Sequence, residues 1–98
     1  MKTIAETEAR QRLGSLSGWT LEGSSIRRQY TFKGFPDAVT FVVRVGFHAE
    51  SVDHHPDFHV NYKRVTLVYS THSAGGLTDK DFDGASTADK IAATIGAA

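Results

Sequence analysis

The sequence contains no cysteine, which excludes disulfide bonds, thiolate metal ligands and a thiol nucleophile. It also lacks an excess of charge, because eleven basic residues balance eleven acidic ones. A balanced chain has neither the electrostatic footprint expected for nucleic-acid binding nor a basic face for anionic lipid. A Gly-rich phosphate-binding loop is missing too. Nucleic acid and membranes are therefore not expected among its partners.

Long hydrophobic runs are absent as well. No segment approaches the length that a membrane-spanning helix needs, and residues 1–6 have none of the apolar core of a signal peptide. We therefore expect a cytoplasmic protein. The chain of 98 residues has the size of one domain, and 40% hydrophobic and 22% charged residues are ordinary for a globular protein. We expect one domain over residues 1–98.

Apolar periodicity and turn residues predict a first helix, two hairpins and a last helix. The first helix is expected over 3–14, with Thr3 as its N-cap and Gly14 at its end. The last helix is expected to begin with a capping box at Thr78-Asp79-Lys80-Asp81 and to run to Ile95. The predicted strands, which alternate apolar and polar residues, are 19–22, 26–32, 58–62 and 65–71.

The segment 36–51 fits two periodicities. Phe41, Val43, Val45 and Phe47 alternate as in a strand. A first apolar stripe instead fits the spacing of a helix and consists of Ala38, Phe41, Val42, Val45, Ala49 and Val52. About sixteen residues without a turn signal are long for a strand and ordinary for a helix, so a helix is predicted. The expected order is α-β-β-α-β-β-α, an α+β fold whose four-stranded antiparallel sheet has helices packed on one face.

A second apolar stripe on this predicted helix is made by Val39, Val43 and Phe47. One face of a small sheet would not cover it together with the first stripe. The surplus predicts a contact between subunits.

Three of the five histidines fall in two short segments, His54-His55 and, seventeen residues after His55, His72. Histidine is the side chain whose unperturbed pKa lets it give and take protons near neutrality. Pro56 biases His55 toward an extended backbone, so His54 and His55 should project in different directions. Asp53 is placed to bond the His54 ring and fix its tautomer. An acid and a base on opposite sides of a small substrate would suffice for an elimination or a tautomerisation.

Simpler explanations apply to several of these residues. His48 and His59 are expected on the surfaces of a helix and a strand. A metal site could draw on His54, His55, His59 and His72, but their spacing fits no standard pattern, and we expect no metal. Trp19 is more often a core residue than a ligand platform, and Asp81 is explained as the partner of Thr78 at the start of a helix.

Taken together, these residues resemble the pterin-4a-carbinolamine dehydratase family. Its signature is Glu-x-x-x-His-His-Pro, then an aromatic residue, a histidine and an aspartate. The matching positions here are Glu50, His54-His55-Pro56, Tyr62, His72 and Asp81, with Gly18-Trp19, Ser70-Thr71-His72 and Gly76-Leu77-Thr78 around them. The resemblance spans nearly the whole chain, and the family has the α-β-β-α-β-β-α order predicted above.

The resemblance implies a reaction, the dehydration of 4a-hydroxytetrahydropterin to quinonoid dihydropterin in tetrahydropterin recycling. The substrate is the carbinolamine that aromatic amino acid hydroxylases produce, which makes a hydroxylase a possible pathway partner, and no cofactor is implied. His54 and His72 would be the acid–base pair, and His55 would bind and orient the pterin. Asp53 would support His54.

The remaining site residues are also implied by the resemblance. Glu50 and Pro56, with the backbone of Thr71 to Ser73, would hold the pterin, and Trp19 and Asp81 would border the pocket. Family members form homodimers or homotetramers through helix packing, in agreement with the second apolar stripe. The alternative is a non-catalytic interaction or assembly module, since some relatives bind a transcription factor or assist assembly of another enzyme. The presence of all three histidines argues for catalysis.

Overall fold

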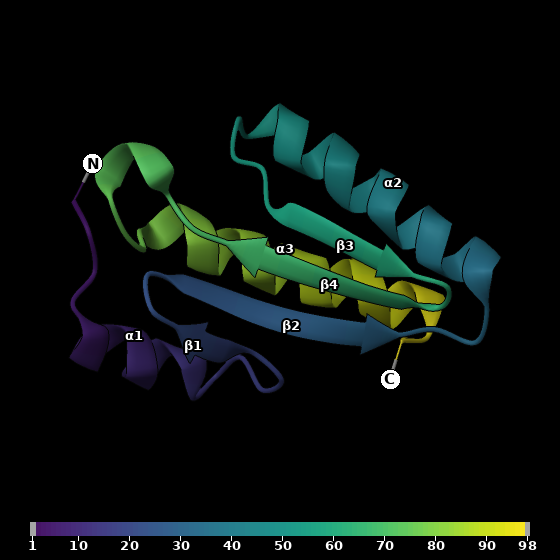
Figure 1. Ribbon diagram of the computed structural model, residues 1–98, viewed down its shortest axis with the longest axis horizontal. Helices are drawn as coiled ribbons and strands as arrows, with labels where there is room; N and C mark the ends of the chain where they lie inside the picture. Colours follow the sequence, from purple (N-terminus) through teal and green to yellow (C-terminus); the bar gives the residue numbers. More distant parts are fainter. Residues whose placement is uncertain (1, 98) are drawn as a thin grey trace.

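A computed structural model describes residues 2–97 and has the predicted order α-β-β-α-β-β-α (Figure 1). The four strands form one antiparallel sheet in the order β1-β2-β4-β3. The elements are α1 (Glu6–Leu13), β1 (Thr20–Glu22), β2 (Ser25–Thr31), α2 (Phe35–Ser51), β3 (Asp57–Asn61), β4 (Arg64–Tyr69), the 3₁₀ turn η1 (His72–Ala74) and α3 (Asp79–Ile95).

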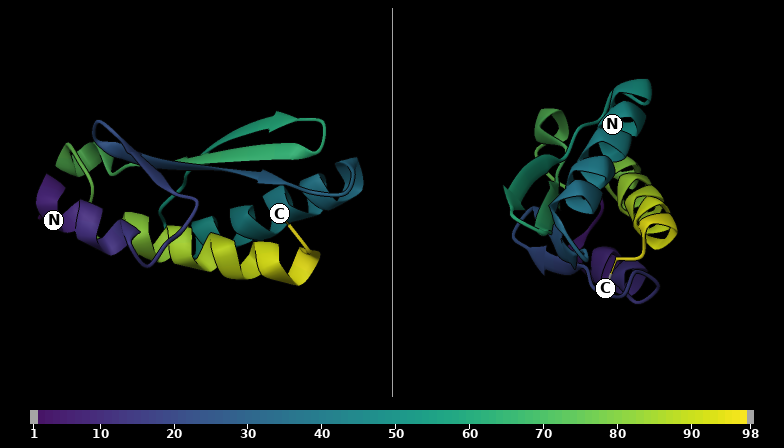
Figure 2. Two further views of the ribbon diagram at one scale, coloured as in Figure 1. Left: turned by 90° about the horizontal axis from the view of Figure 1, so that it is seen from below. Right: turned by 90° about the vertical axis from the view of Figure 1, so that its right-hand side faces the viewer.

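The helices lie on one face of the sheet, and the other face is open (Figure 2). The predicted fold class is therefore confirmed. The two central strands, β2 and β4, pair with each other over six residues each. Because β4 also pairs with β3, its backbone is held on both sides. This strand leads directly into the segment that carries His72.

The core forms between the helices and the covered face of the sheet. Alternate residues of β2 and β4 point into it, as predicted, and Ile26, Tyr30, Val65, Leu67 and Tyr69 are each at most 1% exposed. From the helices they meet a set of apolar side chains that includes Ala38, Phe41 and Val45 of α2 and Phe82, Ala85 and Ala88 of α3. Burial of these aromatic and aliphatic groups is the main stabilising contribution to the fold.

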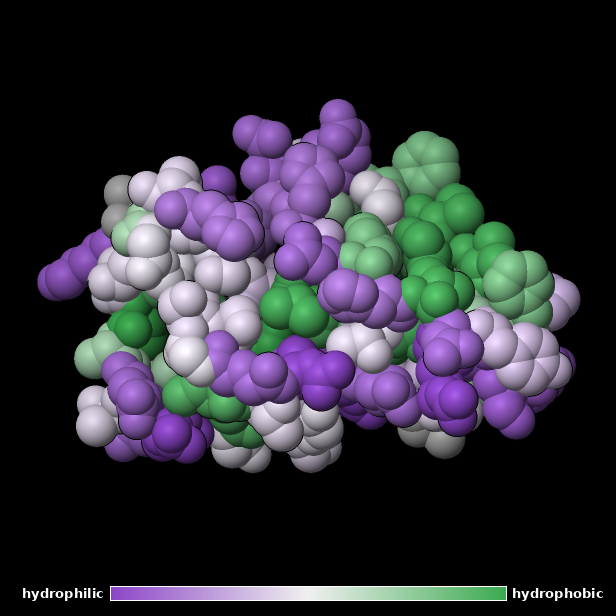
Figure 3. Space-filling model, viewed as in Figure 1, coloured by the Kyte–Doolittle hydropathy of each residue, from purple (hydrophilic) through white to green (hydrophobic). Residues whose placement is uncertain are grey.

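The segment 36–51 is a helix, α2, as its length predicted. Pro36 stands in its first turn, where its missing N–H costs no helical hydrogen bond. Val39, Val43 and Phe47 lie outside the core, with exposed fractions of 40%, 48% and 76%. The space-filling view shows a green apolar region over the α2 side of the molecule (Figure 3). The second stripe is thus exposed, and its role as a subunit contact stays a prediction.

Most predicted boundaries lie within one residue of the observed ones, but two differ by more than one residue. Thr3 does not cap α1, which begins at Glu6 after Ala5. The reason is tertiary: the N–H of Ile4 donates to the carbonyl of Leu77 at 2.7 Å, so the chain runs extended beside a distant segment before it can turn into a helix. The last strand ends at Tyr69, two residues earlier than predicted, and Thr71 pairs with Gly76 in an isolated bridge.

Candidate active site

A buried carboxylate holds the first histidine of the pair. His54 Nε2 lies 2.6 Å from Oδ1 of Asp81, which is 0% exposed. The other oxygen of Asp81 accepts hydrogen bonds from the Thr71 hydroxyl at 2.8 Å and from the Thr78 N–H at 2.9 Å. The two threonine hydroxyls are also 2.8 Å apart. A carboxylate is costly to bury unless it is hydrogen-bonded, and here both of its oxygens have partners.

Asp81 also completes the predicted capping box with Thr78 at the start of α3, which is confirmed. The same side chain therefore begins a helix and orients a histidine. The carboxylate on the His54 ring was expected to be Asp53, but the structure gives this place to Asp81. Asp53 is exposed and has a φ of 52°, which turns the chain out of α2.

The ring of His54 lies against the ring of Tyr69, with centroids 6.0 Å apart and an interplanar angle of 21°. Since Tyr69 faces the core, His54 lies on the helix-covered side of the sheet, and its side chain is 10% exposed. Burial, and after it the negative charge of Asp81, raise the pKa of the Tyr69 hydroxyl. Within residues 2–97 no hydrogen-bond partner meets this hydroxyl, which is buried.

His55 points away from His54, as predicted. Its Nε2 lies 2.8 Å from Oε1 of Glu50, in the last turn of α2, and both side chains are exposed. Glu50 was expected to hold the substrate, and its partner in the structure is His55. Pro56 between His55 and β3 is buried.

His55 and His72 line one pocket of about 210 Å³, which the structure forms on the open face of the sheet. The remaining lining residues are Ser24, Ser25, Asp57, Val68 and Ser70. Val68 alternates with the buried Leu67 and Tyr69, and this places the pocket on the face opposite the helices. Ser70 Oγ donates to the carbonyl of Ser24 at 2.8 Å, which joins the turn between β1 and β2 to the end of β4.

His54 lines a different pocket of about 160 Å³ between the C-terminal part of α2 and the start of α3. Its other lining residues are His48, Val52, Lys80, Asp83, Gly84 and Thr87. The structure therefore brings His55 and His72 together in one pocket on the open face of the sheet. His54 lies in a different pocket, on the side that the helices cover. The acid–base role of His54 stays a prediction.

Trp19 lies in the core, as its residue type predicted, and is 5% exposed. Its Nε1 donates to Asp89 Oδ1 at 3.0 Å, and the same oxygen accepts from Arg28 and from the Tyr30 hydroxyl. Trp19 is not among the residues that line the His55–His72 pocket. The resemblance implied that Trp19 borders the pocket, and the burial of Trp19 in the core does not support this position.

Of the other expected site residues, Thr71 contributes its hydroxyl to Asp81, and Ser73 is exposed in η1. His59 is exposed on β3, as expected, whereas His48 is half-buried on α2. Neither Asp57, which lines the pocket, nor Asp89, which bonds Trp19 and Arg28, was identified from the sequence. Asp57 directly follows Pro56, so its position two residues after His55 was a usable signal. No pattern marked Asp89, whose partners lie up to 70 residues away in the chain.

The metal alternative finds no site in the part of the chain that the structure describes, where no three His, Asp or Glu side chains gather as ligands could. Over the same residues, no helix has the length and apolar character required to cross a membrane.

Fold and site together define a small α+β domain with histidines gathered at one end of an antiparallel sheet. The sequence pattern of the pterin 4 alpha carbinolamine dehydratase family matches residues 2–91. The chain belongs to this family.

Individual relatives agree with this assignment. Provisionally named pterin-4-alpha-carbinolamine dehydratases from Roseiflexus sp. (strain RS-1) and Mycobacteroides abscessus are each 48% identical to the chain, over 88 and 89 residues respectively. These matches cover 90% and 91% of this chain and 95% of each relative. A crystal structure from Brucella melitensis, described as a transcriptional coactivator/pterin dehydratase, is 34% identical with a TM-score of 0.89, covering 93% of this chain and 99% of that one.

A more distant structure shares the fold alone. It is a pterin dehydratase-like protein described as a RuBisCO assembly factor in the alpha-carboxysome, 13% identical with a TM-score of 0.63. The match covers 76% of this chain and 86% of that chain.

Proposed function

We propose that the protein is a hydro-lyase that dehydrates 4a-hydroxytetrahydropterin to quinonoid dihydropterin. The observation that carries the proposal is the pocket that His55 and His72 share on the open face of the sheet. Two imidazoles that line one small pocket can serve as the acid and the base of an elimination. Membership of the pterin carbinolamine dehydratase family supports the class of substrate.

The reaction moves two protons and breaks one carbon–oxygen bond. A protonated imidazole donates to the hydroxyl on C4a, which leaves as water, while a neutral imidazole accepts the proton of N5. The electrons of the N5–H bond form the new double bond between C4a and N5. Neither electrons nor groups are exchanged with a second reactant, so the proposed reaction uses no cofactor. Each imidazole can contribute about a hundredfold to ten-thousandfold as a general acid or base.

We assign the two proton transfers to His55 and His72, because both line the same pocket. Glu50, whose Oε1 lies 2.8 Å from Nε2 of His55, orients this ring. We assign His54 a positioning role: its bond to the buried Asp81 fixes the backbone from which His55 projects. The family resemblance pairs His54 with His72 instead, and the glutamine substitution described in the Discussion separates the two assignments.

The test is a dehydration assay. Enzymatically generated 4a-hydroxytetrahydropterin is followed by ultraviolet absorbance with wild type, with His72→Ala and with no protein. Acceleration over the spontaneous rate that is lost in the variant supports the proposal. A well-folded wild type that gives no acceleration would refute it.

We further propose that the reaction serves tetrahydropterin recycling after an aromatic amino acid hydroxylase, in a homo-oligomer assembled through α2. The exposed stripe of Val39, Val43 and Phe47 supports the oligomer. The same stripe favours the second candidate, a non-catalytic interaction module. The descriptions of the coactivator/dehydratase and the assembly factor are compatible with this second function.

A further inference from the structure

One carboxylate in the His55–His72 pocket has no part in the chemistry described above. Asp57 is the first residue of β3, is exposed, and lines this pocket together with both histidines. None of the ion pairs or side-chain hydrogen bonds found within residues 2–97 includes Asp57. The exposed carboxylates Glu50 and Glu22, in contrast, are paired with His55 and Arg27. The pocket therefore holds an acceptor that is free to meet a ligand.

We propose that Asp57 binds the 2-amino-4-oxopyrimidine edge of the pterin and so determines specificity for 2-aminopteridines. This inference rests on the proposed function, because it places the pterin in the His55–His72 pocket. A pterin presents two parallel donors on that edge, the 2-amino group and N3–H. An ionised carboxylate has two oxygens that accept two parallel hydrogen bonds, the arrangement that also pairs carboxylates with guanidinium groups.

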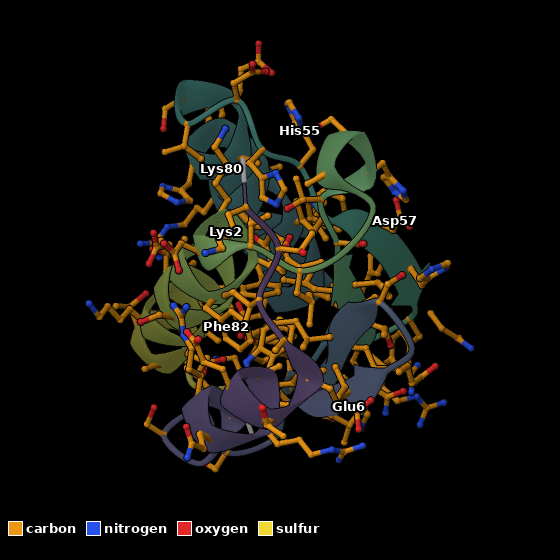
Figure 4. All side chains as sticks on the ribbon, turned by 90° about the vertical axis from the view of Figure 1, so that its left-hand side faces the viewer. Lys2, Glu6, His55, Asp57, Lys80 and Phe82 are labelled. Carbon is orange, nitrogen blue, oxygen red and sulfur yellow. The ribbon has the colours of Figure 1, made fainter. Side chains whose placement is uncertain are left out.

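The separation of His55 and Asp57 along the chain matches the length of a pterin ring. His55 and Asp57 are two residues apart at the extended start of β3, so their side chains leave the same face of the chain about 7 Å apart. A bicyclic ring spans a distance of this order. One end of the pterin would then meet His55 while its pyrimidine edge meets Asp57. In the view of Figure 4, His55 and Asp57 lie on either side of the turn η1, which carries His72.

The other polar groups of the pocket do not compete for this role. Ser70 already donates its hydroxyl proton to the carbonyl of Ser24. A serine hydroxyl offers a single oxygen atom, whereas a planar group with two acceptor atoms matches two parallel donors. Among the lining residues, this description applies to Asp57 alone.

A lumazine tests the assignment because it carries a 2-oxo group in place of the 2-amino group. One donor of the pyrimidine edge then becomes an acceptor, which faces the Asp57 carboxylate unfavourably. In Asp57→Asn the amide offers one acceptor and one donor, which match N3–H and the 2-oxo group of lumazine. Sites built to satisfy hydrogen bonds reject mismatched ligands strongly.

The experiment measures dissociation constants of 6-methylpterin and 6-methyllumazine from quenching of their own fluorescence. Three proteins are compared: wild type, Asp57→Asn and the control Asp37→Asn. Asp37 lies in the first turn of α2, whereas Glu50, the partner of His55, lies in the last turn of this helix. We expect wild type and the control to bind the pterin about tenfold or more tightly than the lumazine, and Asp57→Asn to lose or reverse this preference. An unchanged preference in a folded Asp57→Asn variant overturns the proposal.

The dehydration assay separates this inference from the proposed function. We expect Asp57→Asn to raise KM about tenfold with a smaller change in kcat, since Asp57 touches no reacting atom. If wild type dehydrates the substrate and Asp57→Asn keeps its KM, the role of Asp57 is wrong and the dehydratase stands. If wild type accelerates nothing and binds no pterin, both are wrong.

Discussion

His54 Nε2 and Asp81 Oδ1 lie 2.6 Å apart although 27 residues separate them in the sequence. The contact joins the connection after α2 to the first turn of α3. It also joins His54 to Thr71, because Thr71 donates to the other oxygen of the same carboxylate. Thr71 immediately precedes His72. The two segments that supply histidines are therefore fixed to one buried group.

Removing the charge of Asp81 should destabilise the fold. In Asp81→Asn, one oxygen that accepts hydrogen bonds is replaced by a donor, and Thr71, Thr78 or His54 loses a partner in a buried place. We expect the free energy of unfolding to fall by about 1–3 kcal/mol in urea titrations. The control is Asp79→Asn, two residues earlier, whose side chain is 80% exposed. Equal stability of the two variants would contradict the structural role of Asp81.

Substituting His72 should remove activity without loss of stability. His72 is exposed in η1, so His72→Ala leaves the core intact. We expect the dehydration rate to fall about a hundredfold or more while the melting curve stays unchanged. His59→Ala, exposed on β3 outside the pocket, serves as the matched control and should keep its rate. Full activity in a His55→Ala/His72→Ala double variant would show that the pocket is assigned wrongly.

Glutamine at position 54 distinguishes positioning from proton transfer. In His54→Gln the amide nitrogen can donate to Asp81 as Nε2 does, but the side chain cannot titrate near neutrality. We expect His54→Gln to keep most of the turnover and its pH profile, and His54→Ala to lose both turnover and thermal stability. A comparable loss of turnover in both variants, with His54→Gln fully folded, would instead support the acid–base role that the family resemblance implies.

Alkaline pH should act on the fold through Tyr69. Burial raises the pKa of its hydroxyl above the ordinary value of about 10, so the folded state holds this proton more tightly than the unfolded state does. The resulting stability is complete below about pH 10 and is lost as the pH rises above it. Urea titrations at about pH 8 and pH 11 should show a smaller loss for Tyr69→Phe than for wild type.

The control for Tyr69→Phe is Tyr62→Phe. Tyr62 is 64% exposed in the turn between β3 and β4, so its replacement should leave the alkaline loss as in wild type. Wild-type behaviour of both variants would mean that Tyr69 does not contribute to the pH dependence.

Gly84 is required by the position of Tyr69. A Cβ at residue 84 would lie 2.6 Å from Cε1 of Tyr69, well inside van der Waals contact. Despite the higher helix propensity of alanine, we expect Gly84→Ala to lower the free energy of unfolding by about 1–3 kcal/mol. Combination with Tyr69→Leu should recover part of this loss. Additive effects in the double variant would show that the two residues do not interact.

Most of the fold could be predicted from local patterns. Alternation identified the buried faces of β2 and β4, and length distinguished α2 from a strand, because burial imposes these periodicities on the sequence. The failures came from contacts that leave no periodic trace. The start of α1 is set by the bond between Ile4 and Leu77, which no residue near Thr3 indicates.

In the candidate site, too, features that depend on sequence neighbours could be predicted, and contacts between distant segments could not. The change of direction between His54 and His55 followed from Pro56, since the residue before a proline is restricted to extended backbone. The partner of His54 could not be predicted, because Asp53 is its neighbour in sequence and Asp81 its neighbour in space. Asp81 was assigned correctly to helix capping, a local motif, but its second contact depends on how α3 packs beside the α2–β3 connection.

The central place of β4 has a consequence for how a ligand would be received. β4 is hydrogen-bonded to β2 on one side and to β3 on the other, and it ends two residues before Thr71. Its amide protons should therefore exchange with solvent only in rare, large-scale opening events. Thr71 and Gly76 close the base of the next turn through their bridge. His72 thus projects from a backbone segment that is held in place at both ends. A ligand would meet a preorganised pocket and would not first have to order the loop.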